Sequence, residues 1–305
     1  MFPAFLPDTV QNLTEATSIA QAQAITAAEI VTAIAPQPLR TTYVQTGQAD
    51  ARSAPILLIH GFDSSVFEYR RLQPLLSIER ETYAVDLLGF GFSDRTAGSG
   101  FTPDDIDQHL FDTWRSLIDR PVVLVGASMG GAAAIRFALR HPEAVERLVL
   151  LDSAGIANGP VLGKFLVPPF DKLATDFLKR PSVRSSIGAS AYFNKQLNSD
   201  DARCCAALHL EMPNWHEALI AFTKSGGYPS IRKQLGDVTV PTLILWGRND
   251  KILGTKDALV FDRALPNSQL HWIDQCGHVP HLEAPQATAS HILAFVRSQP
   301  SMLPA

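Results

Sequence analysis

The sequence predicts an α/β fold in which a mostly parallel sheet is flanked by helices and carries a helical cap insertion. From residue 41 onward, short and nearly uninterrupted apolar runs alternate with stretches of helical pattern. Such runs are typical of parallel strands buried on both faces, and the alternation is typical of repeated strand–helix units. It stops between residues 153 and 238, where the chain is helical and rich in loops. With 46% apolar residues among 305, the chain is long enough to bury a sizeable core.

Six apolar runs are predicted as strands of this sheet. They are residues 55–60, 82–86, 121–126, 147–152, 241–246 and 270–273. The stretches between them that have helical spacing and length are 66–77, 102–119, 130–140, 256–264 and 285–297. Because helices connect parallel strands here, we expect the carboxyl ends of the strands to share one edge of the sheet.

We expect a short N-terminal unit, a core and a cap. Residues 1–40 are predicted to form a helical extension, since Ile19, Ile25, Ile30, Val31 and Ile34 recur at roughly helical spacing. This helix either packs on the edge of the core or lies on a membrane. Residues 41–152 and 239–305 are predicted to form the α/β core, and residues 153–238 the cap.

The predicted cap differs from the rest of the chain in charge. It holds ten Lys and Arg against seven Asp and Glu, whereas the whole chain has 26 against 30 and a net charge of −4. Basic side chains such as Lys172, Lys179, Arg180 and Arg184 either form a solvated face or hold the cap on an anionic membrane. The overall charge gives no electrostatic reason to bind nucleic acid, and we expect no nucleic-acid partner.

The cysteines and the N-terminus bear on compartment. Cys204, Cys205 and Cys276 are too few for a disulfide framework, which favours a reducing compartment. The first basic residue is Arg40, so neither a signal peptide nor an Arg-rich transit peptide is expected. No apolar run is long enough for a transmembrane helix.

The strongest chemical signal is a G-x-S-x-G motif at residues 126–130. It directly follows the predicted strand 121–126 and directly precedes a helical stretch, so Ser128 lies at a sharp strand-to-helix turn. That turn lifts a serine hydroxyl above the sheet, where it serves as a nucleophile. Ser128 is therefore the predicted catalytic nucleophile.

A serine nucleophile needs a base, and the base needs an orienting carboxylate. Asp250 follows the strand 241–246, and His278 follows the strand 270–273. The chain order Ser128, Asp250, His278 is the order that this strand arrangement requires. Asp152 also ends a strand and is the alternative acid.

Two further histidines, His60 and His281, lie near predicted strand ends. His60 is expected to shape the loop after the first strand of the core and to lie near substrate with Gly61. His281 and Glu283 lie close to His278, but no third ligand follows at a suitable spacing, so no metal and no cofactor are expected.

The oxyanion that forms during acyl transfer needs preorganised donors. We expect these to be the backbone N–H groups of Met129, directly after the nucleophile, and of Phe62, in the loop after strand 55–60. The G-x-G at residues 89–91 lacks the third glycine of a dinucleotide site and is expected to be a rim loop. Cys204 and Cys205 are expected to be packing residues.

These motifs resemble those of α/β-hydrolases, and the resemblance covers about residues 40–297. The segments HGFDSS, DLLGFGFSD, GASMGG, GRND and CGHVPHLE occur in the expected order. In the dehalogenase and epoxide-hydrolase branches, the resemblance implies aspartate at the nucleophile position. Ser128 at that position therefore argues against these branches.

Further segments resemble the chlorophyll dephytylases of plants and cyanobacteria. They are FEYRRLQPLL, ETYAVDLLGFGFSD, WRSLIDRPVVLVGASMGG, HPEAVERLVLLDSAG and LHLEMPNWHEALIAFTKSGGY, and the last lies in the predicted cap. The resemblance implies hydrolysis of the phytyl ester of chlorophyll, for example chlorophyll a. It implies a location in the cytoplasm or peripherally at the thylakoid membrane. Contact with the membrane would be made by the cap or the N-terminal segment. The resemblance thins out before residue 40 and across about 156–200.

A long isoprenoid ester needs an apolar pocket, and aromatic side chains of the cap are the candidates for its wall. Those predicted to bind substrate are Phe165, Phe170, Trp215, Phe222 and Tyr228; the alternative is that they form the cap's own core. Other functions that fit the motifs are a general carboxylesterase, a C–C bond hydrolase with the same triad, and a non-catalytic binder that retains the fold.

Overall fold

The computed structural model describes residues 1–96, 100–158 and 167–298, and it confirms the predicted fold class. An eight-stranded sheet has the order β1-β2-β4-β3-β5-β6-β7-β8. The pairs β1–β2 and β2–β4 are antiparallel, and all other neighbours are parallel. The strands are β1 (Thr26–Ile30), β2 (Leu39–Thr46), β3 (Ile56–Ile59), β4 (Thr82–Val85), β5 (Val122–Ala127), β6 (Val145–Leu151), β7 (Thr242–Gly247) and β8 (Ser268–Ile273).

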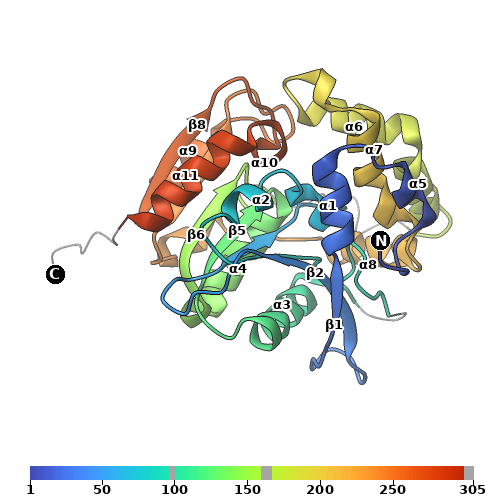
Figure 1. Ribbon diagram of the computed structural model, residues 1–305, viewed down its shortest axis with the longest axis horizontal. Coiled ribbons are helices and arrows are strands. Elements are labelled where there is room, and N and C mark those ends of the chain that lie inside the picture. The colour runs from blue at the N-terminus through green and yellow to red at the C-terminus, as the bar shows by residue number, and fades with distance from the viewer. Residues whose placement is uncertain (97–99, 159–166, 299–305) are drawn as a thin grey trace.

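Helices cover both faces of this sheet (Figure 1). Those of the core are α1 (Ala16–Ala24), α2 (Gln73–Leu76), α3 (Pro103–Leu117), α4 (Met129–Arg140), α9 (Lys256–Ala264), α10 (Pro280–Glu283) and α11 (Pro285–Arg297). Helix α3 begins where the sequence dictates, because Thr102 and Asp105 form a reciprocal capping box and Pro103 occupies the first turn. The helix predicted at 66–77 is instead a 3₁₀ turn, η2 (Val66–Tyr69), followed by α2.

The apolar strands build two cores because successive side chains point to opposite faces. Leu57 and Ile59 pack with α3, α4 and α9 on one face. Ile56 and Leu58 pack with α2, α11 and the N-terminal segment on the other. Burial on both faces explains why β3, β5 and β7 lack polar alternation.

The prediction for the N-terminal extension is only partly confirmed. Residues 8–12 form a 3₁₀ helix, η1 (Asp8–Asn12), and residues 16–24 form α1, but residues 26–30 form strand β1. The helical prediction was wrong there because pairing with β2, across registers such as Thr26 with Tyr43, satisfies the backbone at the sheet's edge. Local spacing of apolar residues carries no information about such a distant partner.

The segment between β6 and β7 contains helices and no strand in its described part. These helices are α5 (Phe170–Lys179), α6 (Pro181–Ala191), α7 (Asp200–Ala207) and α8 (Trp215–Ser225), with a 3₁₀ turn η6 (Leu208–Glu211) before α8. We refer to residues 153–238 as the cap segment. Its helices gather on one side of the molecule, and α1 runs beside α7 (Figure 1).

The N-terminal segment is fastened to both the cap segment and the core. The Asp201 carboxylate of α7 accepts the backbone N–H groups of Thr14 and Glu15 at 2.6 and 2.8 Å. Glu15 in turn pairs with Arg71, with both oxygens at 2.7 Å. Apolar residues of this segment, such as Val10, are buried inside the protein. Across the three described stretches of chain, no helix has the length and apolar character needed to cross a bilayer.

Candidate active site

Ser128 occupies the sharp turn between β5 and α4. Its backbone has φ 52° and ψ −118°, a conformation that residues with a side chain rarely adopt. Glycines permit the turn: a Cβ on Gly126 would lie 2.3 Å from the Gly130 carbonyl oxygen, and one on Gly130 would lie 2.3 Å from that of Ile59. Helix α4 therefore starts directly against the sheet, and the half-buried Ser128 stands at the carboxyl end of β5.

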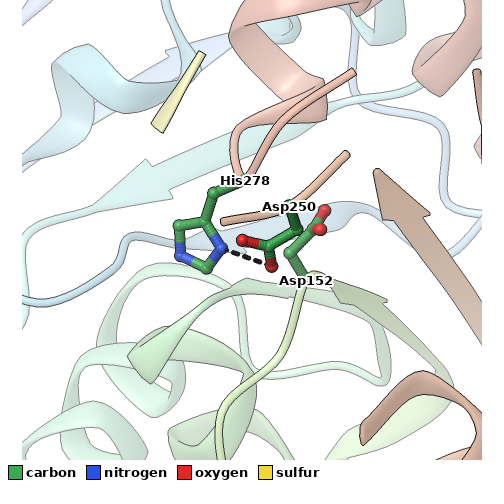
Figure 2. Close-up of side chains that lie close together, drawn as sticks. All are labelled: Asp152, Asp250 and His278. Atoms are coloured by element: carbon green, nitrogen blue, oxygen red, sulfur yellow. Dashed lines mark hydrogen bonds and ion pairs between the residues drawn. The ribbon is translucent and has the colours of Figure 1, made fainter. Parts of the chain in front are cut away.

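The side chains of Ser128, His278 and Asp250 form one hydrogen-bonded chain. His278 Nε2 lies 3.0 Å from Ser128 Oγ, and His278 Nδ1 lies 2.9 Å from Asp250 Oδ2. Because a carboxylate only accepts hydrogen bonds, Nδ1 carries the proton and Nε2 is free to accept one from the serine. Figure 2 shows the imidazole ring pointing its Nδ1 edge at Asp250. This tautomer is the one that a general base requires.

Asp250 is held ionised by the loop that follows β7. Its Oδ1 accepts the backbone N–H groups of Ile252 and Leu253 at 2.7 and 3.1 Å. Burial opposes ionisation, but these bonds and the one from His278 outweigh it and lower the pKa of Asp250 below its ordinary value. Asp250 is therefore a charged partner for the imidazole at neutral pH.

Asp152, the alternative acid, lies beside Asp250 but in a different state (Figure 2). It is completely buried, and only its Oδ1 has a partner in the described chain, the Gly247 N–H at 3.0 Å. Burial and the neighbouring Asp250 charge raise the pKa of Asp152 well above its ordinary value. Both effects favour the protonated, neutral form of Asp152, and no bond joins it to His278 among the described residues.

Asp152, Asp250 and His278 each offer a ligand atom within 4.8 Å of the other two. A metal ion there would have to displace the Asp250–His278 hydrogen bond and remove the proton from Asp152. His281 and Glu283 are engaged elsewhere: His281 Nε2 lies 3.1 Å from Glu68 Oε1, and Glu283 accepts the Gly277 N–H at 2.6 Å. The donor set fits an acid–base relay better than a cation site.

The loop after β3 carries the N–H of Phe62, one predicted oxyanion donor. Its start is fixed to the core, because the Gly61 N–H donates to Glu68 Oε2 at 2.7 Å. His60 Nδ1 lies 2.8 Å from the Gly61 carbonyl oxygen, while His60 Nε2 accepts the Leu87 N–H at 3.1 Å. The structure places Gly61 against Ser128, since a Cβ on this glycine would lie 3.3 Å from the serine Cβ.

Glu68 is the buried charge on which this loop rests. Burial opposes its ionisation, but contacts with His281, His60 and the Gly61 N–H lower the pKa of Glu68 from 4.5 to about 2. Since the folded pKa is below the unfolded one, this carboxylate stabilises the fold above pH 4.5. That contribution, about 3 kcal/mol, is lost as the pH falls from 4.5 toward 2.

We therefore expect Glu68→Gln to flatten the acid side of the stability curve. Urea unfolding followed from neutral pH down to about pH 3 should show a smaller decline in the free energy of unfolding than in the wild type. Glu29→Gln, which alters an exposed carboxylate, is the control and should follow the wild-type curve. Parallel curves for Glu68→Gln and wild type would contradict the assignment.

A cavity of about 320 Å³ adjoins this loop and the turn at Ser128. Of the residues predicted at the site, Phe62, Met129, Phe222 and Tyr228 line it. Its other walls are Ala132, Ala154, Gly155, Ala157, Asn158, Thr223, Gly226, Gly227, Leu253 and Asp257. Among the described residues that line the cavity, none is Lys or Arg. The space is suited to an apolar, uncharged group.

The other predicted substrate-binding residues do not line this cavity. Trp215 is 3% exposed and packs with Leu210 and Leu219 inside the cap segment. Phe170 is 62% exposed on α5. His60 is fully buried, so it shapes the loop rather than meeting substrate. Composition alone does not say which face of a cap helix turns toward this cavity, and a role of Phe170 and Trp215 in binding substrate stays a prediction. Phe165 lies outside the described residues.

Sequence reasoning missed several cavity residues and one buried acid. Gly155 and Asp257 were missed because they lie in or after loops without a chemical motif. Asp63 was missed although it directly follows Phe62. The available signal was a charged residue in the loop that holds a predicted oxyanion donor. Its carboxylate contacts the cap segment, as described below.

Comparisons with known proteins bear on this site. Residues 56–291 match the family model described as "Alpha/beta hydrolase family". The Arabidopsis thaliana "Alpha/beta hydrolase domain-containing protein VTE7" is 31% identical, over 97% of this chain and 89% of the relative. The 2-hydroxy-6-oxo-2,4-heptadienoate hydrolase of Pseudomonas putida is 30% identical, over 75% of this chain and 84% of its own length.

Solved structures of other hydrolases have a similar fold. A serine hydrolase involved in carbazole degradation superposes with a TM-score of 0.71 and 26% identity, covering 89% of this chain and 99% of the other. An esterase from Thermogutta terrifontis superposes with a TM-score of 0.75 over 89% of this chain and 98% of the other. At 23% identity, the second likeness concerns the fold alone.

Proposed function

This chain belongs to the alpha/beta hydrolase family as a serine hydrolase, and from that premise we propose that Ser128, His278 and Asp250 are its catalytic triad. The hydrogen-bonded chain from Asp250 through His278 to Ser128 supports these roles. The strained turn at Ser128 supports the nucleophile, since strain of this kind collects at functional sites.

The proposed reaction is acyl transfer to serine followed by hydrolysis. His278 Nε2 takes the proton of Ser128 as Oγ attacks the ester carbonyl, and the oxyanion accepts from the N–H groups of Met129 and Phe62. His278 then protonates the departing alcohol. Water, activated by the same imidazole, hydrolyses the acyl-enzyme and regenerates Ser128. Each oxyanion donor is expected to supply about 3 kcal/mol of transition-state stabilisation.

The apolar lining of the cavity is the observation that carries the substrate proposal. The heptadienoate named for the Pseudomonas putida relative bears a carboxylate, and no basic side chain lines this cavity within the described chain. Among the residues described around the cavity, a buried carboxylate finds no basic partner. We therefore propose an ester with a long apolar alcohol, and specifically the phytyl ester of chlorophyll a, with the pigment acid held on Ser128 and phytol leaving.

The test is incubation of the wild type and Ser128→Ala with chlorophyll a in mild detergent, with chlorophyllide and phytol quantified. Product from the wild type alone supports dephytylation. Brisk hydrolysis of p-nitrophenyl esters without release of phytol would contradict the pigment as substrate and retain the triad.

A carboxylesterase for smaller esters is the second candidate. The cavity volume of about 320 Å³ favours it, because pockets for small ligands span about 300–1,000 Å³ and this one lies at the lower end. A series of p-nitrophenyl esters separates the candidates. If kcat/KM falls steeply beyond a short chain, the smaller substrate is favoured; if it rises with chain length, the long one is.

We also propose that α5 rests on an anionic membrane. Phe170, Leu173 and Phe177 are 62%, 57% and 51% exposed and share one face of the helix, and we call them the α5 ridge. Exposed Lys179 and Arg180 flank it, as does exposed Asp176. An apolar face beside basic side chains is the pattern that binds anionic lipid surfaces.

Removing two rings of the α5 ridge should weaken that binding. We expect Phe170→Ser with Phe177→Ser to lower association with anionic vesicles by about 100-fold or more, since each buried ring contributes about 1.5–3 kcal/mol. Co-sedimentation with vesicles measures it. The control is Val31→Ser with Ile78→Ser, which alters two apolar residues elsewhere that are 76% and 79% exposed. Equal binding by both double variants would refute the contact.

A further inference from the structure

We call the loop after β3, which carries Gly61 and Phe62, the oxyanion loop. Asp63 is the residue of this loop that contacts the cap segment. It directly follows Phe62, has a left-handed backbone with φ 48°, and is only 6% exposed. Aspartate is among the few residues with a side chain that adopt this conformation readily. This left-handed conformation turns the Asp63 side chain away from the rest of the loop, so that its carboxylate contacts the cap segment.

The Asp63 carboxylate accepts hydrogen bonds from separate elements of the cap segment. Oδ1 accepts from Trp215 Nε1 of α8 at 2.9 Å and from His209 Nε2 of η6 at 3.1 Å. Oδ2 accepts from Arg184 Nη1 of α6 at 2.5 Å. Arg184 also donates to the Ala206 carbonyl oxygen at 2.7 Å, so the same guanidinium holds α6 against α7.

The charge of this cluster is balanced within the protein. Burial opposes ionisation of Asp63, but His209, Arg184 and Trp215 outweigh it and hold the pKa of Asp63 well below its ordinary value. Removing the carboxylate would leave the half-buried Arg184 guanidinium and the buried N–H donors of His209 and Trp215 without their acceptor. The seating of the cap segment therefore depends on Asp63.

We infer that Asp63 is a positioning residue that couples the seating of the cap segment to the geometry of the oxyanion loop. On one side of Phe62 the loop is fixed to the core through Gly61 and Glu68. On the other side it is fixed to the cap segment through Asp63. The Phe62 N–H reaches its place only when both attachments hold. This inference rests on the proposed function, since it assumes that this N–H stabilises an oxyanion.

The test compares Asp63→Asn with Asp201→Asn. Asp201 is also buried and also accepts several hydrogen bonds across a junction, from Thr14, Glu15 and Ser18, but it does not contact the oxyanion loop in the described structure. We expect Asp63→Asn to lower kcat for a short p-nitrophenyl ester by about 10- to 100-fold with KM changed little, because misplacement by about 1 Å has effects of this size. Asp201→Asn should lose thermal stability and keep the wild-type kcat.

The rate of labelling by a fluorophosphonate probe gives a second readout that is independent of substrate size. It should fall in Asp63→Asn in parallel with kcat. If Asp63→Asn does not fold, Arg184→Gln is the replacement, with an expected loss of about 3- to 10-fold. A labelled wild type together with an equally reactive Asp63→Asn or Arg184→Gln would overturn the inference and leave the triad standing. A wild type that is not labelled would contradict the triad itself, and the inference with it.

Discussion

Replacing Ser128 with alanine is expected to lower kcat for ester hydrolysis by about 10⁶-fold. The variant lacks the oxygen that forms the acyl-enzyme, and only binding and the oxyanion donors would remain to accelerate attack by water. His278→Ala should have nearly the same effect, and combining the two should add little, because the residues act as one unit. Steady-state hydrolysis of a p-nitrophenyl ester and fluorophosphonate labelling measure both.

The matched control for Ser128→Ala is Ser153→Ala. Ser153 is fully buried just after β6, and its hydroxyl donates to the Ala154 carbonyl oxygen at 2.8 Å. Loss of that bond should lower stability slightly and leave labelling intact. Activity retained by Ser128→Ala, in protein with wild-type circular dichroism, would remove Ser128 from the mechanism.

Replacing Asp250 with asparagine is expected to lower kcat by about 10⁴-fold. An amide does not hold the imidazolium charge, and its NH₂ group favours the tautomer in which Nε2 carries the proton and no longer accepts from Ser128. The loop around residue 250 should keep its shape, because the remaining amide oxygen still accepts from the Ile252 N–H. The loss should therefore appear in kcat while thermal stability changes modestly.

Asp152→Asn is the matched control for Asp250→Asn. Burial and the Asp250 charge raise the pKa of Asp152 and so favour its neutral form, which an amide of the same shape resembles; the Gly247 N–H keeps its acceptor. We expect kcat within about tenfold of wild type, since no bond to His278 is lost. A large loss of kcat in Asp152→Asn with a small loss in Asp250→Asn would instead identify Asp152, at the end of β6, as the acid that orients His278.

The central parallel strands were predictable from sequence because burial on both faces makes them apolar almost throughout. The parallel edge strand β8 alternates in exposure instead, and it begins two residues before the predicted run 270–273. Runs such as 55–60 and 241–246 hold no polar alternation, and β3 and β7 lie within them or one residue away. Strand β1 was not predictable, because only its pairing with β2, whose partner residues lie 9 to 17 positions further along the chain, makes it a strand. Edge strands take their stability from a partner that a local pattern does not contain.

The side chains of the candidate triad were named from sequence because each lies two to five residues past the end of a predicted strand. Their catalytic roles stay a prediction. The cavity wall was harder, since it depends on how the cap helices rotate: Phe222 and Tyr228 face the cavity, whereas Trp215, seven residues before Phe222, faces the inside of the cap segment. Asp63 had no recognisable motif, because its partners come from three elements that are distant in sequence.

The cap segment is a single insertion between β6 and β7, while Ser128, Asp250 and His278 stand on three loops of the core. Exchanging that one stretch of chain is therefore expected to change the part of the cavity wall that Phe222 and Tyr228 form, and to leave the candidate triad on its own scaffold. The bonds of Asp63 set a condition on any such graft. A transplanted cap has to supply a guanidinium and an indole or imidazole N–H that bind the Asp63 carboxylate. Without them, the loop after β3 would lose its attachment to the cap.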